Sequence, residues 1–261
     1  MRAASLQLSS QGMSSTKLYN YIRIAHKKGV KVLLLGEYIL NPFFKELESL
    51  SINMIKDQAK FQIKILKELS STYQMTIVAP LIMVKKGKVY KTIVKFAPSS
   101  TFYYEQQILI NYKHWNEEKF YANEKKALQT PFIFKVDGFK FAIISGFELH
   151  FDQLFLKLKS KNIDCILVPS VSTFDSYERW KSLILSRAFI NNCYILRANR
   201  IGEYADKDYD WQFYGDSILA SPDGDLLEHL GNKEELMIVD MNHSDVVTSR
   251  RIWGFKELAK R

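Results

Sequence analysis

The sequence predicts a single layered α/β domain in which buried strands lie between helices. Three observations predict it. Short apolar runs alternate along the chain with longer segments of helical spacing. Several apolar runs are rich in Val, Ile and Leu and lack polar alternation, which is typical of strands covered on both faces. The chain is long enough for one large core, and no linker or internal repeat divides residues 1–261.

The expected strands are six apolar runs, and the expected helices are the four amphipathic segments among them. Gly29 is expected to end the first helix, because glycine readily adopts the left-handed conformation found after many helices. Pro-Asp-Gly at 222–224 predicts a turn between two strand-like runs within 220–230. Strands are expected at 31–37, 75–80, 90–97, 139–145, 164–170 and 193–199. Helices are expected at 15–29, 52–74, 151–162 and 176–192.

Composition and charge argue against several classes of protein. With 47% hydrophobic and 25% charged residues, the chain has an ordinary globular composition. No apolar run approaches the roughly 18 residues that a membrane helix needs. The start, MRAASLQLSS, lacks the long apolar region of a signal peptide, so we expect a cytoplasmic protein. The net charge of +9 is spread over scattered lysines, which favours a solvated basic surface over a specific nucleic-acid site. Nonspecific polyanion binding is the alternative.

The two cysteines predict buried side chains rather than a disulfide. Cys165 lies in the apolar run "DCILVP" and Cys193 in "NCYILRAN", where a small hydrophobic residue is expected. So few cysteines are typical of a reducing compartment. No Cys/His/Asp spacing suggests a metal site and no Gly-rich loop suggests a phosphate site, so neither a metal nor a cofactor is expected.

One long stretch carries a specific pattern. In residues 178–202, "ERWKSLILSRAFINNCYILRANRIG", Arg-Ala, Asn, Cys-Tyr and Asn-Arg-x-Gly occur in an order and spacing that resembles the nitrilase, or carbon–nitrogen hydrolase, superfamily. The resemblance covers nearly the whole chain and implies a four-layer α-β-β-α sandwich, paired into a homodimer or higher homo-oligomer. The other resembling segments are "ASLQL" (4–8), "LLLGE" (33–37), "NEEKFY" (116–121), "IISGFELHF" (143–151), "ILVPS" (166–170), "YGDSILASPDG" (214–224) and "LMIVDMN" (236–242).

The resemblance implies a glutamate, a lysine and a cysteine as the reacting groups. In the family a thiolate attacks an amide or nitrile carbon, the glutamate moves protons and the lysine helps hold the oxyanion. Glu37 closes the strand "KVLLLGE" and matches the family glutamate. The stretch "YEQQILI" (104–110) places Gln107 at the lysine position, and Lys113 is the alternative. A second glutamate, which orients the lysine, is matched by Glu117 or Glu118.

The expected nucleophile is missing from the stretch "FAIISGFELHF" (141–151). The family has Cys-aromatic-Asp/Glu at this strand end, whereas this chain has Gly146-Phe147-Glu148, so Gly146 stands where sulfur is expected. Ser145 is one residue away, and in a strand that shift turns a side chain to the other face. A sharp turn relaxes that rule, so Ser145 remains an alternative nucleophile that needs a partner base.

Aromatic residues and two histidines are expected around the ligand. His150 lies four residues beyond Gly146, near the mouth of the expected pocket. His114 stands among aromatics in "YKHWNEE", and Phe147 follows Gly146 directly. For each histidine a packed structural role is the competing interpretation.

Three functions remain open from the sequence. The first is an amidase-type hydrolase of a small non-peptide amide that uses Glu37 with water, Ser145 or Lys113. The second is a catalytically inactive nitrilase-fold protein that binds a small molecule or has a regulatory role. The third is an interaction protein with a basic surface and a vestigial pocket. The apparent loss of two reacting groups, at Gly146 and Gln107, favours the second, because such groups act as a unit.

Overall fold

The computed structural model describes residues 1–255 and contains two six-stranded sheets. The first has the strand order β14-β1-β2-β3-β4-β5 and the second β13-β12-β9-β8-β7-β6. Three adjacent strands of each sheet are parallel and the remaining pairs are antiparallel. The first sheet comprises β1 (Arg2–Gln7), β2 (Val32–Leu35), β3 (Thr76–Lys85), β4 (Lys88–Ala97), β5 (Ser100–Glu105) and β14 (Glu235–Asp240). The second comprises β6 (Ile133–Val136), β7 (Phe139–Ile143), β8 (Cys165–Pro169), β9 (Tyr194–Ala198), β12 (Ile218–Ala220) and β13 (Leu226–His229).

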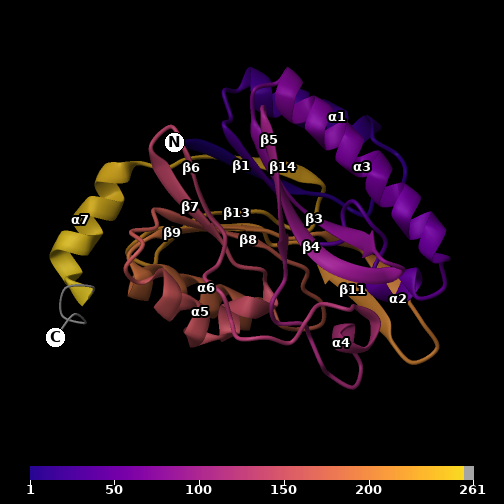
Figure 1. The fold of residues 1–261 in the computed structure, drawn as a ribbon. Coiled ribbons are helices and arrows are strands. Elements are labelled where there is room, and N and C mark those ends of the chain that lie inside the picture. Colours follow the sequence, from indigo (N-terminus) through magenta and orange to yellow (C-terminus); the bar gives the residue numbers. More distant parts are fainter. Residues whose placement is uncertain (256–261) are drawn as a thin grey trace.

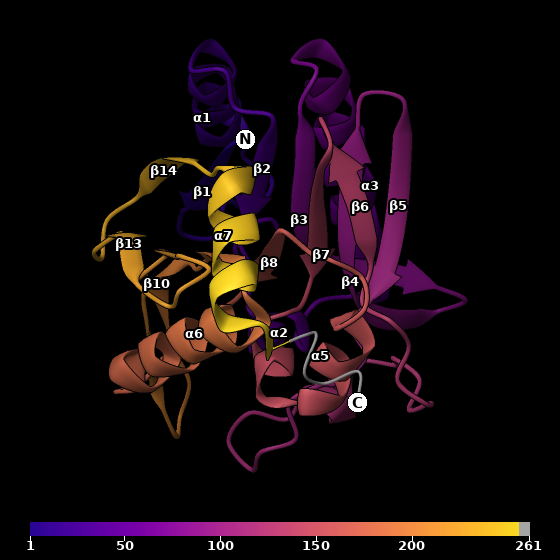
Figure 2. The ribbon, with the colours of Figure 1, turned by 90° about the vertical axis from the view of Figure 1, so that its left-hand side faces the viewer.

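Helices cover the outer face of each sheet, which confirms the four-layer α-β-β-α sandwich (Figure 1). The described helices are α1 (Thr16–Lys27), α2 (Phe44–Leu47), α3 (Ile52–Thr72), α4 (Glu117–Phe120), α5 (Asp152–Leu158), α6 (Tyr177–Asn191), α7 (His243–Trp253) and the 3₁₀ turn η1 (Phe147–His150). Leu18 of α1 and Leu66 of α3 pack against the first sheet, and Phe155 of α5 and Ile184 of α6 pack against the second. The helix α7 lies on a flank of the sandwich, away from α2 and α4 (Figures 1 and 2).

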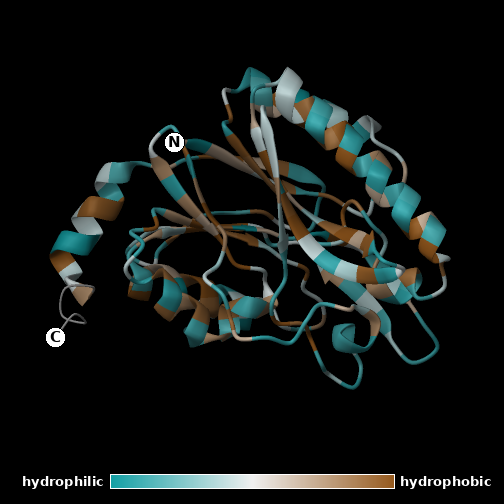
Figure 3. Cartoon of the chain, in the orientation of Figure 1, coloured by the Kyte–Doolittle hydropathy of each residue, from teal (hydrophilic) through white to brown (hydrophobic). Residues whose placement is uncertain are grey.

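The main core lies between the two sheets. Val32, Leu34 and Val78 of the first sheet form one buried cluster with Ile143 and Leu167 of the second. Figure 3 shows these strands as mostly hydrophobic, whereas the outer helices carry both hydrophobic and hydrophilic residues. Burial on both faces explains why the central strands have no polar alternation.

All six expected strands and all four expected helices are present, with small shifts at their ends. The largest shift is in β3, which runs to Lys85 instead of ending at residue 80. It continues because β3 and β4 form a hairpin whose two-residue turn, Lys86-Gly87, has both residues at positive φ. The expected turn after residue 220 connects β12 with β13. A further pair, β10 (Ile201–Ala205) and β11 (Asp210–Tyr214), was not expected.

Candidate active site

Glu37 lies just beyond β2, where the parallel strands of both sheets end. Its backbone N–H donates to the carbonyl of Ser170, which follows β8 of the other sheet, at 2.9 Å. Gly36 permits this approach, because a Cβ added there would lie 2.8 Å from the backbone carbonyl carbon of Asn199. Tyr38 follows at a φ of 57°, which is uncommon for a non-glycine residue and turns the chain sharply. The Glu37 carboxylate is thereby held in the interior.

Lys91 on β4 brings the positive charge to this site. Its Nζ lies 2.6 Å from Oε2 of Glu37 and 2.7 Å from Oε1 of Glu117. None of the three side chains is more than 4% exposed. The Tyr38 hydroxyl also donates to Glu117 at 2.7 Å and lies 3.2 Å from the hydroxyl of Tyr121. We refer to Glu37, Lys91 and Glu117 as the charge cluster.

Burial and mutual charge set the protonation of the charge cluster. Burial lowers the pKa of Lys91, but the charges of Glu117 and Glu37 outweigh it, so the pKa lies above its usual value. Lys91 is therefore protonated at neutral pH. Burial raises the pKa of Glu37, Lys91 opposes that rise and Glu117 adds to it. One cation is thus shared by two buried carboxylates.

The turn after β7 places Ser145 against Glu37. The Ser145 hydroxyl donates to Oε1 of Glu37 at 3.1 Å. Glu148 fixes the turn, because its carboxylate accepts the backbone N–H groups of Ser145 (3.1 Å), Gln107 (2.7 Å) and Ile108 (3.2 Å). Burial raises the pKa of Glu148 to about 7, and the three N–H donors oppose that rise.

This turn contains no thiol. The Gly146 N–H donates to the Pro169 carbonyl at 2.8 Å, and a Cβ added to Gly146 would lie only 2.7 Å from Cβ of Ser170. Cys165 and Cys193 are buried among the hydrophobic residues of the second sheet, as the sequence predicted. Burial also raises the pKa of Cys165 well above its usual value. Neither sulfur lies at the strand ends near Glu37, because Cys165 begins β8 and Cys193 directly precedes β9.

Gln107 does not extend toward the charge cluster. Its side-chain amide instead contacts the Tyr104 hydroxyl at 2.5 Å and the Gln129 carbonyl at 3.2 Å. Gln106 is the buried neighbour, and its backbone N–H donates to the carbonyl of Lys91 at 3.1 Å. The lysine therefore comes from β4, directly across from the end of β5 where the family pattern places it.

Two further predicted residues lie outside the charge cluster. Lys113 is exposed, and within residues 1–255 it forms no ion pair, so it does not supply the lysine of the site. Glu118 pairs with Lys125 at 2.6 Å near the surface. Of the two alternatives, Glu117 is the glutamate that contacts Lys91.

Lys91 was missed in the sequence, although a signal was present. In "KVYKTIVKFA" (88–97), Lys91 shares a strand face with Val89 and Ile93, because side chains alternate along a strand. Both neighbours are buried. A lysine between two inward-facing apolar residues is rare unless it is paired, so this position indicated a buried ion pair.

A pocket of about 280 Å³ adjoins the charge cluster, and we call it the aromatic pocket. The Ile110 N–H reaches Oε2 of Glu117 at 3.4 Å, and Phe147 directly follows Gly146. Ser145 and the charge cluster themselves do not line it. The structure brings three predicted ligand-facing residues, His114, Phe147 and His150, to this pocket. The lining comprises Ile110, Tyr112, His114, Trp115, Phe147, His150, Val171, Ser172, Thr173, Phe174, Ser176, Arg179 and Trp180.

A larger hollow of about 590 Å³ lies elsewhere, around Met1, Lys31 and Phe139. It contains no residue of the charge cluster or of the turn at Gly146, so size does not identify the site. Among the residues that the structure describes, no group of three or more His, Cys, Asp or Glu side chains is arranged to hold a metal ion. None of the described helices has the length and apolar character to cross a bilayer.

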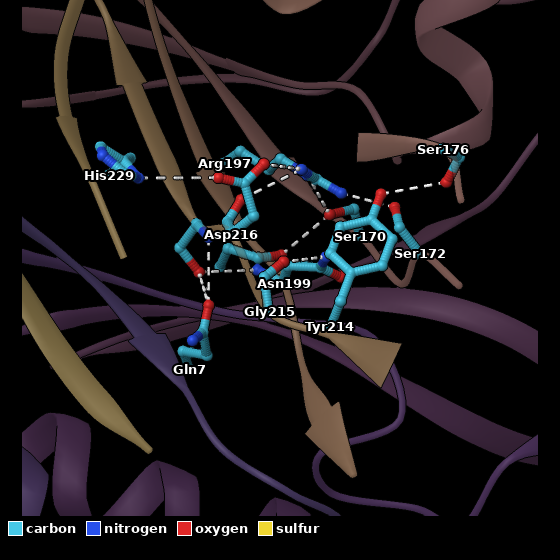
Figure 4. A network of polar contacts seen from close by, with 12 residues as sticks. Gln7, Ser170, Ser172, Ser176, Arg197, Asn199, Tyr214, Gly215, Asp216 and His229 are labelled. Carbon is cyan, nitrogen blue, oxygen red and sulfur yellow. Dashed lines mark hydrogen bonds and ion pairs between the residues drawn. The ribbon is translucent and has the colours of Figure 1, made fainter. Parts of the chain in front are cut away.

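Arg197 on β9 forms a second buried network beside the aromatic pocket (Figure 4). Its guanidinium donates to the hydroxyls of Ser170 and Ser172 and to the backbone carbonyl of Asp216. The distance to the Asp216 carboxylate is longer, at 3.4 Å. Burial raises the pKa of Asp216 to about 6, and Arg197 opposes that rise. The guanidinium also lies over the Trp180 ring, 5.2 Å from its centroid, so two pocket residues contact Arg197.

Comparisons with known proteins connect this geometry to a family. The model of the carbon-nitrogen hydrolase family matches residues 2–251. An N-carbamoylputrescine amidase from Oryza sativa subsp. japonica is 22% identical over 254 residues, which are 89% of this chain and 82% of the rice protein. A deaminated glutathione amidase from Dictyostelium discoideum is 30% identical over 106 residues, 40% of this chain. The match spans only 35% of that amidase.

Solved structures agree in fold. The crystal structure of a carbon-nitrogen hydrolase from Helicobacter pylori G27 is similar with a TM-score of 0.83 and 20% identity, over 100% of this chain and 95% of that one. At this identity the likeness shows the fold alone. With the family model matching nearly the whole sequence, the chain belongs to the carbon-nitrogen hydrolase family.

Proposed function

We propose that this family member binds a small amide-type molecule in the aromatic pocket and does not hydrolyse it through a thiol. Gly146 carries the proposal. It stands at the strand end where the family pattern has cysteine, and the neighbouring Ser170 leaves little room for a side chain there. Thiol-dependent C–N hydrolysis needs a sulfur atom that forms a bond to the substrate carbon. This site retains acid, base and cation without that atom.

The charge cluster supports a pocket in which only the nucleophile is lost. Lys91 is held between two carboxylates at 2.6 and 2.7 Å and is almost fully buried. The resemblance likewise implies a glutamate that orients the lysine, so this pairing alone does not account for a loss of catalysis. The aromatic pocket remains beside this cluster, so we place ligand binding there.

A second candidate is a hydrolase that uses Ser145, and the 3.1 Å hydrogen bond from its hydroxyl to Glu37 favours it. In such a reaction Glu37 would take the hydroxyl proton while Oγ bonds to the amide carbon. The proton would then pass to the departing amine, and water would release the acid from the ester. Against this candidate, Ser145 is fully buried and Glu37 is already paired with Lys91.

Ammonia release from a panel of small amides, carbamoyl amines and nitriles separates the two candidates. The native protein is assayed beside Ser145→Ala and Glu37→Gln, and tryptophan fluorescence measures binding of the same compounds. The proposal expects saturable binding and only background ammonia from all three proteins. Turnover by the native protein that disappears in both variants would establish the serine route instead.

We also propose that the protein forms a homodimer through the α5–α6 layer. Leu156 of α5 is 65% exposed and Ile190 of α6 is 55% exposed, which leaves apolar side chains uncovered on this layer. The resemblance to a family that pairs through one helical layer supports the same face. A cytoplasmic location, a single domain over residues 1–261 and the absence of specific nucleic-acid binding stay predictions from the sequence.

A further inference from the structure

The charges that line the aromatic pocket are of one sign. Arg179, in the first turn of α6, lines the pocket and is exposed. Within residues 1–255 its guanidinium forms no ion pair or hydrogen bond, so it is available to a ligand. No lining side chain is a carboxylate, and His114 and His150 add ring nitrogens that can hydrogen-bond a ligand.

A second guanidinium lies directly behind the lining. Arg197 is buried, and its Nη2 donates to the hydroxyl of Ser172, which lines the pocket. Its only carboxylate partner, among the residues that the structure describes, is Asp216 at 3.4 Å. At that distance the two groups form an ion pair, so Asp216 offsets much of the charge of Arg197. Arg197 contributes mainly by contacting Ser172 and Trp180 in the wall of the pocket, and Arg179 is the exposed guanidinium that faces a ligand.

The rings of the lining give the pocket a flat, apolar character. His114 lies parallel to Tyr112, with centroids 5.7 Å apart, and contacts Phe174 edge-on at 5.8 Å. Near Phe147, the His150 ring contacts Trp180 edge-on at 5.1 Å. Such walls suit a planar or apolar ligand body, and a volume just below the usual range of roughly 300–1,000 Å³ suits a small one.

Aromatic rings can also attract cations, so the lining could in principle favour a ligand of either charge. The guanidinium of Arg197 already lies over the Trp180 ring at 5.2 Å. One strong cation–π site of the pocket is thus occupied by the protein itself. With no lining carboxylate to neutralise it, a ligand cation would meet Arg179 as a like charge.

We propose that the aromatic pocket selects a small amide that carries a carboxylate on a planar or apolar body, that Arg179 binds this carboxylate, and that cationic amides are rejected. The inference rests on the proposed function, because it assigns the ligand class of the same pocket. A bidentate bond between a guanidinium and a carboxylate supplies both affinity and orientation.

Three probes that share one ring and one amide test the selection. They are 4-carbamoylbenzoate, terephthalamide and 4-(aminomethyl)benzamide, which are anionic, neutral and cationic at neutral pH. Binding is measured by titration calorimetry at 0.15 M salt. We expect the anion to bind about tenfold more tightly than the neutral diamide, and the cation to bind most weakly.

Arg179→Gln identifies the residue responsible. We expect it to weaken binding of the anion about tenfold and to leave the neutral diamide unchanged. The matched variant Arg23→Gln, on the exposed outer face of α1, should change neither affinity.

Equal affinity for anion and neutral diamide, or tighter binding of the cation, would overturn the inference while leaving the pocket assignment intact. An unchanged anion affinity in Arg179→Gln would overturn the role of that residue. Absence of binding by all three probes would overturn both the inference and the proposed function.

Discussion

At the scale of single residues, Lys91 is the main departure from the expected site. It lies between Glu37 and Glu117 and compensates the negative charge of these two buried carboxylates. Removing one partner of a buried ion pair is expensive, because the remaining charge stays desolvated and uncompensated. We infer that Lys91 is required for stability whether or not the site has any turnover.

Lys91→Met is expected to lower the free energy of unfolding by about 3–5 kcal/mol near pH 8. Without Lys91 the Glu37 pKa, already raised by burial, rises further. The folded protein then binds protons more readily than the unfolded chain, so the stability deficit should shrink as the pH falls from 8 toward 5. Urea unfolding across this pH range measures the effect. Lys95→Met provides the comparison, since Lys95 is on the same strand and forms no ion pair within the described chain.

The pKa of Lys91 also makes the stability of the native protein depend on pH. Its pKa is raised in the folded state, so its contribution is fully present below the pKa of the unfolded chain and is lost as the pH rises through the folded value. The native protein should therefore lose stability above about pH 10 more steeply than Lys91→Met does. A deficit in Lys91→Met that is constant with pH, or no larger than that of Lys95→Met, would contradict the role given to Lys91.

The same residues show what sequence could predict of the site. Glu37 and the turn at Gly146 were predictable, because each lies in a local pattern at the end of an apolar strand. The position of Lys91 between two apolar residues indicated a buried ion pair, but its partners were not predictable, because they depend on the pairing of β4 with β5 and on a glutamate 26 positions away. Gln107 was assigned to the lysine position for the same reason. The sequence near the end of β5 does not reveal whether Gln106 or Gln107 faces inward.

At the scale of elements, the site depends on how closely the strand ends of the two sheets approach. Glu37 follows β2, Ser145 follows β7 and Ser170 follows β8. The hydrogen bond from the Glu37 N–H to the Ser170 carbonyl joins the two sheets at this point. Gly36 contributes by lacking a side chain where Asn199 passes. The carboxyl ends of parallel strands thus gather the polar groups, as they do in many α/β proteins.

Gly36→Ala should disturb this junction. The added Cβ would meet backbone atoms of Asn199 at 2.8 Å, and backbone moves less easily than a side chain, so a loss of about 1–3 kcal/mol in unfolding free energy is expected. Gly231→Ala is the matched substitution, because nothing lies within 4 Å of a Cβ there. Chemical denaturation of both variants measures the difference, and equal stability of the two would show that the strand ends are not tightly joined at Gly36.

Strands were predicted where they form long apolar runs and were missed where polar residues interrupt them, as in the buried strand β1. The central strands are apolar and bounded by turns, so their sequences alone identified them. Strands β5, β10 and β11 escaped prediction because most of their residues are exposed or partly exposed and polar residues interrupt them. Such edge strands are stabilised by their neighbours, and a single-sequence pattern does not contain those neighbours.

At the scale of the whole molecule, the α5–α6 layer leaves apolar side chains uncovered around a hollow. Leu156 and Ile190 expose apolar surface on the α5–α6 layer beside Phe255, where a hollow of about 430 Å³ lies. Exposed apolar patches on a folded protein often mark interfaces. The proposed homodimer would cover this layer and leave the strand-end pocket on each subunit.

Leu156→Asp combined with Ile190→Asp is expected to convert the dimer to a monomer, because two buried and unpaired carboxylates at an interface are strongly unfavourable. Light scattering coupled to size-exclusion chromatography measures the mass. Ile24→Asp, an exposed apolar residue on the opposite helical layer, should leave the mass unchanged. A native protein that is monomeric at tens of micromolar would contradict the proposed pairing.

The central claim is that this fold keeps the charge cluster and the pocket but lacks the atom that attacks the substrate. The most direct measurement is steady-state ammonia release by the native protein beside Gly146→Cys combined with Ser170→Gly, which removes the 2.7 Å Cβ contact. Ser170→Gly alone controls for the loss of that side chain, and circular dichroism confirms that each variant is folded. We predict background release from the native protein and from Ser170→Gly, and turnover from the combined variant. Ammonia release by the native protein that vanishes in Glu37→Gln would contradict the claim.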